Sequence, residues 1–489
     1  MRRPTLARRP ASTRRAGAAE GRIRPLTPGR GLASNGDVTR SRGASAYLFA
    51  SLALALSFAS ALVAGAARAN DGDVFGLGSE AIARGGAMTA VATGWDATFY
   101  NPAGLALHGR REITVGYFRI LPDLEIHLSS ETRHPRIENP DAAIVGATLP
   151  LGSRVGLGIG AVVLPTTIIR VISHSPDVPF ISWFDNRTQR LALFPAVGVR
   201  PLDWLSLGVG ANFLAGLDGL ATAGDGPSRA VESSVLQEIF SRVSVHAGVR
   251  VDAPHGLSFG VAYRQRFYAP FTERIRTTVG GFPLDIAVDA RTLQTPHEIA
   301  FGSAWHRGAL TLSLDATLLL WSLERSPYVR VDATVSGVHI APEPLASVYR
   351  DTFNVRAGLA VDHRVGRDVT LRYRLGGALE PTYVDDQPGR TSLLDGTKVT
   401  LAGGLGVTIA HVLPRPFSLD VHAQAIALAS RRFDKVVSTI AEARVNPNVI
   451  ADEDADLPGD QISNRGFPAV SGGGVVYSLG ASVTFEVDR

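Results

Sequence analysis

The strongest constraint on the fold is a two-residue alternation of apolar and polar side chains that recurs along the chain from Arg111 onward. The runs are roughly ten residues long, the length of a tilted strand that crosses a membrane. In residues 309–320 the polar side includes Asp315, and residues 369–375 and 418–428 show the same pattern. A charged side chain that faces lipid at the bilayer midplane costs about 2–4 kcal/mol, so the polar faces are expected to line a lumen.

Short polar turns join pairs of these runs and set the expected number of strands. Six such turns alternate with seven longer connections rich in proline, glycine and charge. This predicts an all-β fold: an antiparallel transmembrane barrel of about fourteen strands over residues 111–489, with both termini on the periplasmic side. The turns lie at 151–154, 201–204, 253–256, 306–308, 365–368 and 414–416; the longer connections lie near 122–140, 165–187, 216–240, 268–296, 322–351, 379–396 and 429–474.

Two other architectures fit the pattern less well. A soluble β-sandwich also alternates, but it would place the charged face in bulk water and would rarely sustain so many long strands. A multi-pass helical protein needs about 20 consecutive apolar residues for each helix, and only one block near the N-terminus qualifies.

That apolar block has the features of an export signal. Arg40 and Arg42 precede an apolar core at 47–64, and residues 67–69 read Ala-Arg-Ala, a small-x-small cleavage pattern. The mature protein is expected to begin near Asn70, and an uncleaved anchor is the competing interpretation. The preceding residues are long for a signal, so residues 1–69 are expected to be a signal peptide with a spurious N-terminal extension. A start at Val38 would leave a signal of normal length.

Composition excludes several functional classes. The chain has no cysteine, which removes disulfides, thiolate metal sites and cysteine nucleophiles. The formal charge of +4 owes much to arginines before residue 45. No aromatics are interleaved with them and an export signal follows, so nucleic-acid binding is not expected.

Residues 70–110 lack strand alternation and are rich in glycine and alanine, so they cannot form a core alone. They contain Arg84-Gly85-Gly86-Ala87, then Asp96 to Leu105 with Asn-Pro-Ala at 101–103. These residues resemble the N-terminal hatch of the outer-membrane long-chain fatty acid transporter family, the FadL-like proteins, which includes TodX-like aromatic-hydrocarbon channels. Residues 315–322, 381–395 and 403–406 are similar to further family signatures.

The resemblance implies a barrel of the bacterial outer membrane with residues 70–110 folded inside as a hatch. It also implies passive, ligand-gated uptake of a hydrophobic small molecule, a fatty acid or a hydrocarbon. Outer-membrane lipid and the barrel assembly machinery would be its other partners, although the terminal aromatic, Phe485, lies four residues from the end. The hatch and gating residues implied are Arg84, Gly85, Gly86, Asp96, Asn101, Pro102, Ala103 and Gly104.

Local chemistry supports specific roles within this segment. Asn101 precedes a proline and is pushed out of the helical region, so a helix is expected to end there, with Asn101 bracing the turn. Glycines allow close backbone approach or a positive φ. Arg84 and Asp96 are expected to form a charge pair, because a lone buried charge is costly. A purely structural role for each of these residues remains open.

Two further sets of residues are candidates for ligand contact. Arginines expected in the lumen could hold a carboxylate, or could pair with wall acids such as Asp315, Asp362 and Asp420. Apolar residues at helical spacing in 231–240 predict an amphipathic helix. The resemblance implies a capture groove in the loops at 216–240 and 268–296, unless these loops only pack on each other. The arginines are Arg250, Arg264, Arg356, Arg372 and Arg374; the capture candidates are Leu236, Ile239, Phe240, Phe267, Tyr268, Phe271 and Phe282.

No enzyme, cofactor or metal chemistry is expected. The string Gly156-Leu157-Gly158-Ile159-Gly160 alternates as a strand, with no helix after it as a dinucleotide fingerprint requires. Ser244 and His246 share a strand face, but no nucleophile elbow is present. A general porin for polar solutes and a barrel that binds secreted proteins remain the alternatives, and a porin would lack the hatch.

Overall fold

The computed structural model describes residues 75–135, 141–163, 169–170, 175–181, 189–190, 192–225, 231–279, 282–340, 345–410, 415–452 and 464–488. The predicted export signal, its cleavage site and Val38 lie outside the described residues. Among the described residues, no helix is both long enough and apolar enough to cross a membrane.

Within the described part of the chain, fourteen antiparallel strands close into a ring, which confirms the predicted fold class. The ring closes because β1 pairs with β3 on one side and with β25 on the other. In order the strands are β1 (Arg111–His127), β3 (Asp141–Pro150), β4 (Val155–Val163), β8 (Ala192–Leu202), β9 (Leu205–Asp225), β10 (Val231–Ala253), β11 (Leu257–Arg264), β14 (His297–Arg307), β15 (Leu310–Leu320), β18 (Thr352–Val365), β19 (Val369–Glu380), β21 (Lys398–Ile409), β22 (Phe417–Asp434) and β25 (Ala469–Asp488).

The alternation places apolar side chains outside and polar side chains inside. On β15, Leu312 and Leu314 are 41% and 53% exposed, whereas Ser313 and Asp315 are 6% and 2% exposed. The same inversion runs round the ring, where exposed leucine, valine and phenylalanine face outward. Since water would favour the opposite arrangement, the outer surface is built to contact lipid.

The short turns and the long connections lie at opposite ends of the barrel. The predicted turns between β3 and β4, β8 and β9, β10 and β11, β14 and β15, and β18 and β19 are confirmed. The turn before β22 lies partly outside the described residues. Arg111 pairs with Asp488, so the barrel's chain ends share the short-turn end. This end is periplasmic and the other is extracellular, as in outer-membrane barrels.

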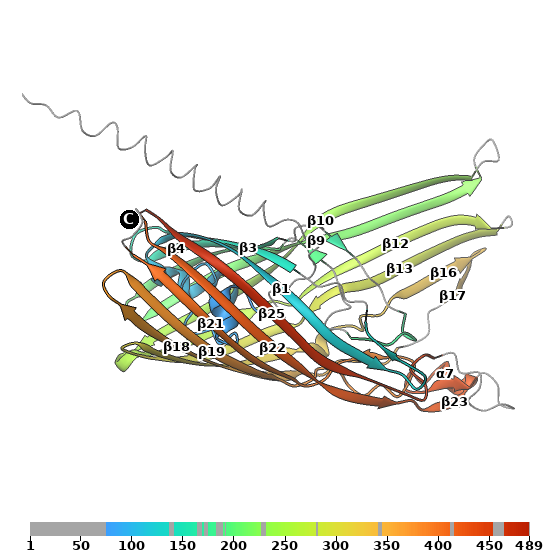
Figure 1. The fold of residues 1–489 in the computed structure, drawn as a ribbon. Coiled ribbons are helices and arrows are strands. Elements are labelled where there is room, and N and C mark those ends of the chain that lie inside the picture. Colours follow the sequence, from blue (N-terminus) through green and yellow to red (C-terminus); the bar gives the residue numbers. More distant parts are fainter. Residues whose placement is uncertain are drawn as a thin grey trace, which may run out of the picture. The chain divides into compact units, whose positions relative to one another are not determined.

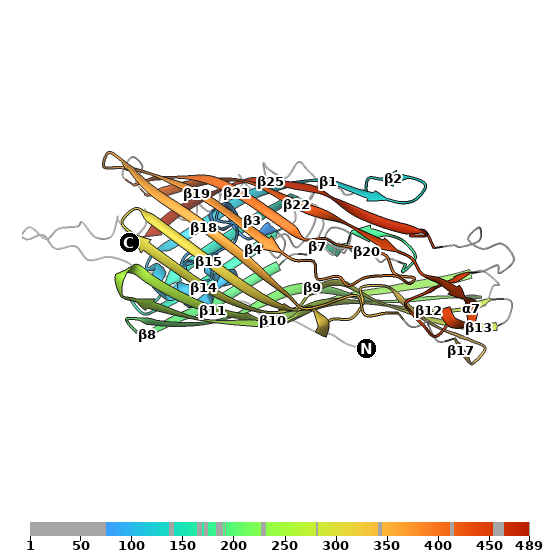
Figure 2. The same cartoon turned by 90° about the horizontal axis from the view of Figure 1, so that it is seen from below.

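The N-terminal segment, residues 75–109, lies inside the ring (Figures 1 and 2). Its helix α3 contacts β19, β21, β22 and β25, η1 contacts β8, β9 and β10, and α5 contacts β3 and β4. Only a position within the lumen allows one short segment to reach strands from all sides. Its helices are α3 (Ser79–Ala83), α4 (Ala97–Tyr100), η1 (Pro102–Gly104) and α5 (Leu105–His108).

Glycines on the inner wall make this fit possible. At Gly376 an added side chain would collide with the backbone of Arg84 and Gly85, and at Gly208 with that of Pro102. The strands thereby approach the N-terminal segment backbone to backbone. We call the following positions, where an added side chain would contact this segment, the wall glycines: Gly146, Gly156, Gly158, Gly160, Gly198, Gly208, Gly248, Gly260, Gly302, Gly358, Gly376 and Gly404.

The helix predicted for residues 231–240 is wrong, because these residues continue strand β10. They pair in regular antiparallel register with residues 216–225 of β9. The predicted loop at 268–296 is likewise a hairpin of β12 (Phe267–Val279) and β13 (Phe282–Thr295). Strand β12 lies beside β9 in parallel and β13 pairs with β16 (Arg330–Val335), so hairpins replace the expected loops (Figure 1).

The other long connections carry small elements. Their aromatic and aliphatic residues, including Phe180, Tyr328 and Leu393, belong to the same buried core as parts of the barrel interior. The extracellular connections therefore fold over the lumen. These elements are β2 (Thr132–Arg133), β5 (Ile169–Arg170), β6 (Phe180–Ile181), β7 (Gln189–Arg190), η2 (Pro254–Gly256, in a short turn), η3 (Trp321–Leu323), β17 (Val338–Ile340), β20 (Leu393–Leu394), β23 (Val437–Thr439), α7 (Ile440–Ala443) and β24 (Ile450–Asp452).

Candidate functional site: a lumenal cavity above the N-terminal segment

Asn101 fixes the turn of the N-terminal segment and ties it to the wall. Helix α4 ends at Asn101, whose backbone is extended (φ −158°), and Pro102 begins η1, as predicted. The Asn101 side chain accepts from the N–H of Ala103 at 3.2 Å and donates to the carbonyls of Thr89 at 2.8 Å and Val249 at 3.1 Å. With 1% of its surface exposed, Asn101 links two parts of the segment to strand β10.

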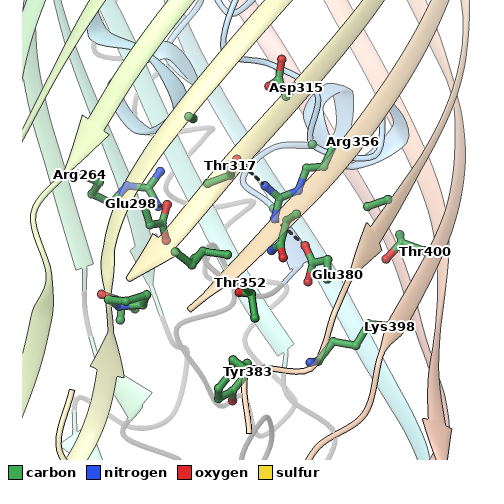
Figure 3. A pocket seen from close by; sticks show the side chains of 18 of the residues that line it. Arg264, Glu298, Asp315, Thr317, Thr352, Arg356, Glu380, Tyr383, Lys398 and Thr400 are labelled. Carbon is green, nitrogen blue, oxygen red and sulfur yellow. Dashed lines mark hydrogen bonds and ion pairs between the residues drawn. The ribbon is translucent and has the colours of Figure 1, made fainter. Parts of the chain in front are cut away.

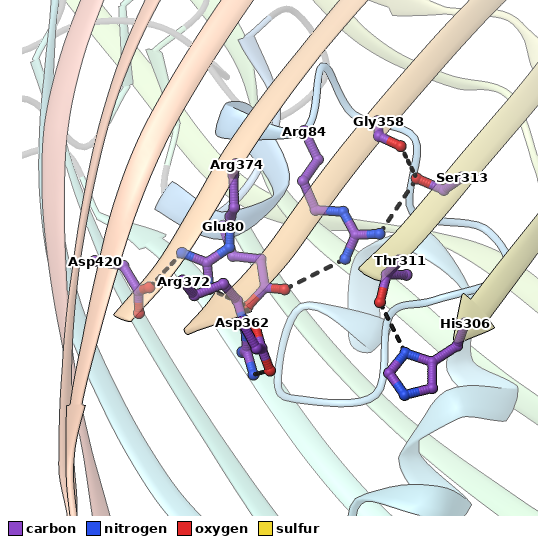
Figure 4. Close-up of polar contacts among 10 residues, drawn as sticks. All are labelled: Glu80, Arg84, His306, Thr311, Ser313, Gly358, Asp362, Arg372, Arg374 and Asp420. Carbon is purple, nitrogen blue, oxygen red and sulfur yellow. Dashed lines mark hydrogen bonds and ion pairs between the residues drawn. The ribbon is translucent and has the colours of Figure 1, made fainter. Parts of the chain in front are cut away.

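An ion-pair network attaches helix α3 to the opposite wall (Figure 4). Glu80 accepts from Arg374 of β19 at 2.9 Å and lies 3.5 Å from Arg84 within its own helix. Arg374 also donates to Asp420 of β22 at 2.6 Å. Burial raises the pKa of Glu80, but Arg374, Arg372 and Arg84 outweigh it and lower that pKa to about 2. Glu80 is therefore the anionic centre of an arginine cluster.

The structure corrects the predicted charge pair of Arg84 and Asp96. Arg84 pairs with Glu80 and donates to Ser313 at 3.3 Å, because α3 presents Glu80 one turn before it. Asp96 instead directly precedes α4. Burial and the charge of Glu80 raise the pKa of Asp96 to about 7, although His108 and a hydrogen bond from the N–H of Ala97 act to lower it. Sequence reasoning missed Glu80, although its spacing of four residues from Arg84 was a usable signal.

The predicted glycine roles divide into two kinds. Gly85 and Gly86 have positive φ values of 65° and 77° and form the turn after α3. Gly104 has an ordinary φ, and its lack of a side chain lets the carbonyl of Ala92 approach. Ala103 is fully buried in η1 between strands. These residues shape the segment; none of these contacts assigns gating to them.

A cavity of about 210 Å³ lies between the N-terminal segment and the extracellular connections. Its lower surface is formed by residues of the segment, among them Gly86, Thr89 and Tyr100. Figure 3 shows wall side chains converging on it, including Thr352 and Thr400. The N–H of Thr89 donates to Asp315 of β15 at 2.8 Å, which fastens the cavity floor to the wall.

An aromatic cluster forms the extracellular side of the cavity. The rings of Trp321 and Tyr383 stack with centroids 4.1 Å apart at 9°, and Tyr349 packs against both. All three residues line the cavity and follow or precede barrel strands at the long-connection end. Trp321 and Tyr383 lie in the segments 315–322 and 381–395, whose sequences resemble family signatures, but the sequence alone predicted no role for either residue.

The candidate lumen arginines are held by acids. Arg264 pairs with Glu298 at 3.1 Å and Arg356 with Glu380 at 2.5 Å, and all four side chains line the cavity. Arg372 pairs with Asp362 and Arg374 with Asp420, away from the cavity. Arg250 pairs with Asp252 at 3.0 Å. Of the wall acids expected to pair with these arginines, Asp362 and Asp420 do so. Asp315 instead accepts a hydrogen bond from the N–H of Thr89 in the N-terminal segment.

Three buried carboxamides also line the cavity. Gln294, Asn354 and Gln424 are each 7% exposed and come from β13, β18 and β22. In the described part of the protein, no hydrogen-bond partner lies within reach of either amide atom of Gln294, of Asn354 Oδ1 or of Gln424 Oε1. The cavity therefore combines aromatic surface with open hydrogen-bonding capacity.

Among the predicted capture residues, the structure describes the side chains of Leu236, Phe267 and Tyr268. Leu236 is 55% exposed on β10, whereas Phe267 is 6% exposed at the start of β12. Tyr268 is half-buried with the guanidinium of Arg242 over its ring at 5.2 Å. The side chains of Ile239, Phe240, Phe271 and Phe282 lie outside the described structure, although their backbones belong to β10, β12 and β13.

Ring, apolar outer surface and filled lumen together define a class: a fourteen-stranded β-barrel of the bacterial outer-membrane type with an internal N-terminal segment. The sequence matches no family model and no curated protein. Among solved structures, it is similar to a Pseudomonas aeruginosa FadL homologue (TM-score 0.53, 15% identity, 84% of this chain and 98% of that one). It is also similar to the P. putida toluene transporter TodX (TM-score 0.53, 13% identity, 85% and 99%). The chain has the fold of these FadL-like barrels.

Proposed function

We propose that this protein is a passive channel for small hydrophobic molecules across the outer membrane. The main support for this proposal is the cavity between the N-terminal segment and the aromatic cluster of Trp321, Tyr349 and Tyr383. Such a cavity offers a ligand a binding position on the extracellular side of the segment. The similarity in fold to the toluene transporter TodX supplies the ligand class by analogy.

The size of the cavity favours a compact ligand over a long chain. At about 210 Å³ it exceeds the roughly 150 Å³ cavity that accepts benzene in an engineered core. It is smaller than the roughly 300–1,000 Å³ pockets that hold drug-sized molecules. A single-ring compound fits this space, whereas a long-chain fatty acid would require the cavity to open further.

In this proposal the N-terminal segment acts as a hatch below the bound ligand. Its contacts through Asn101, Glu80 and the wall glycines hold it in the lumen. The roles of Arg84, Asp96 and the glycines in gating belong to the same proposal. Ligand binding would bias the segment toward a second arrangement that opens a route onward.

A general porin and a barrel that binds secreted proteins are less well supported. A porin needs a water-filled lumen, which barrels of 16–18 strands provide. In this narrower ring the N-terminal segment packs directly on the wall glycines. No described feature of the extracellular hairpins points to a particular protein partner.

Uptake by intact cells tests the proposal. Gram-negative cells that lack their own toluene channel should take up labelled toluene faster when they express this protein. Expression should increase the uptake of labelled oleate much less. Ala378→Phe places a ring in the cavity and should return toluene uptake to the background rate. Ala423→Phe, on the exposed face of β22, is the matched control and should behave as the native protein. Undiminished uptake in Ala378→Phe cells would remove the cavity from the route.

A further inference from the structure

The polar lining of the cavity carries information about the ligand beyond its size and hydrophobicity. A cavity for a pure hydrocarbon would be expected to have apolar walls, because a buried polar atom without a partner costs about 1–3 kcal/mol. Here Gln294, Asn354 and Gln424 are nine-tenths buried, and each has at least one amide atom without a partner in the described structure. They come from three different strands and line one space.

The open atoms are mainly acceptors. Asn354 Oδ1, Gln424 Oε1 and Gln294 Oε1 lack donors, and so does Oδ1 of Asp315, which lines the same cavity. Gln294 Nε2 adds one open donor. A hydroxyl group donates one hydrogen bond and accepts others, so it is complementary to this set.

The charged groups argue against a carboxylate. Arg264 and Arg356, the cavity arginines, are engaged by Glu298 and Glu380 at 3.1 and 2.5 Å. A carboxylate ligand would have to displace a wall glutamate or sit among open acceptor oxygens. Either arrangement leaves like charges or lone pairs facing each other in a buried space.

We propose that the cavity selects compact aromatic alcohols or phenols, whose ring packs on the cluster of Trp321 and Tyr383 while the hydroxyl pairs with the carboxamides. This inference rests on the proposed function, since it assumes that the cavity is a ligand site. It narrows the hydrophobic substrate to a ring that bears a hydrogen-bond donor.

Calorimetric titration of the purified full-length barrel in detergent provides the test, with benzyl alcohol, toluene and benzoate as probes. Ala378→Phe protein, titrated in parallel, corrects for partition into detergent. Benzyl alcohol should bind about tenfold more tightly than toluene, the effect of one well-placed hydrogen bond, and benzoate should bind more weakly than benzyl alcohol. Equal binding of benzyl alcohol and toluene, or tightest binding of benzoate, would overturn the inference.

Two single variants assign the preference to the carboxamides. Gln294→Leu and Asn354→Leu remove amides at similar size, so each should lower affinity for benzyl alcohol while toluene binding is retained, which also reports a folded cavity. Asn212→Leu is the matched control, because Asn212 is buried on β9 and does not line the cavity. If both variants still bind benzyl alcohol more tightly than toluene by the native factor, Gln294 and Asn354 do not bind the hydroxyl group and the inference is wrong.

Failure of this inference differs from failure of the proposed function. If all three probes bind alike while toluene uptake still depends on the space beside Ala378, the channel stands and hydroxyl selection falls. If no probe binds and expressing cells take up toluene at the background rate, both fall.

Discussion

At the scale of single residues, close backbone packing and directed hydrogen bonds together hold the N-terminal segment against the barrel wall. Wall glycines bring strand backbones against this segment, and Asn101 and Glu80 add a few directed bonds. The glycine string at 156–160 illustrates the point, since α5 and its neighbours occupy the space where side chains would be. Its period-two pattern marked a strand, but only the folded lumen explains why the residues are glycines.

A matched pair of alanine substitutions tests this steric fit. Gly376→Ala forces a methyl group against the backbone of Arg84 and Gly85, and overpacking of this kind costs about 1–3 kcal/mol. We expect the N-terminal segment to loosen and the ion leak through single barrels in planar bilayers to rise. Gly403→Ala should not change the leak, because its methyl group would lie no closer than 3.6 Å to any neighbour. Identical leaks in the two variants would mean that close packing does not seat the segment.

At the scale of elements, sequence alternation predicted the barrel strands well. Prediction failed where pairing with a distant segment determines whether residues form a helix or a strand. Val231, Val235 and Ile239 are spaced for a helix, but their odd numbering also places them on one face of a strand. These residues form a strand because they pair with the glycine- and alanine-rich part of β9. The sequence of 231–240 itself contains no signal that identifies this partner. The turn at Asn101 was predictable because proline acts on its immediate neighbour.

Asp96, which directly precedes α4, should make the stability of the seated N-terminal segment depend on pH. The pKa of this carboxyl is raised to about 7 from an ordinary 3.8. A raised pKa means that its contribution to stability is fully present below about pH 4 and is lost as the pH rises through about 7. We therefore expect a larger bilayer leak at pH 8 than at pH 5.

Asp96→Asn should keep the leak at its low-pH value throughout this range, because the amide does not ionise. Asp434→Asn, at an exposed site on β22, should leave the pH dependence intact. A pH dependence that persists in Asp96→Asn would place its origin elsewhere.

At the scale of the whole molecule, counting turns was enough to predict the number of strands, whereas the cavity was beyond sequence reasoning. Its walls combine Gln294, Asn354 and Gln424 with Trp321 and Tyr383, residues that only the closed ring and the folded connections bring together. The partners of the lumen arginines depend in the same way on register between strands.

Removal of residues 71–100 tests how far the barrel depends on what it contains. The wall strands keep their complete ladder of pairing, so the shortened protein should still show heat-modifiable migration on gels. Its lumen should empty, and single-channel conductance in planar bilayers should rise well above that of the native protein. Conductance equal to the native value would show that the segment does not obstruct the lumen.

The seam between β1 and β25 has a consequence for how such a molecule is assembled. The N-terminal segment directly precedes β1, and the ring closes only when β25 joins β1 along its length, from Arg111↔Asp488 to His127↔Ser471. Until that last pairing forms, the sheet is an open ribbon with the segment attached to one margin. Curling of the ribbon can wrap the segment from the side, so the segment never has to be threaded through a finished pore.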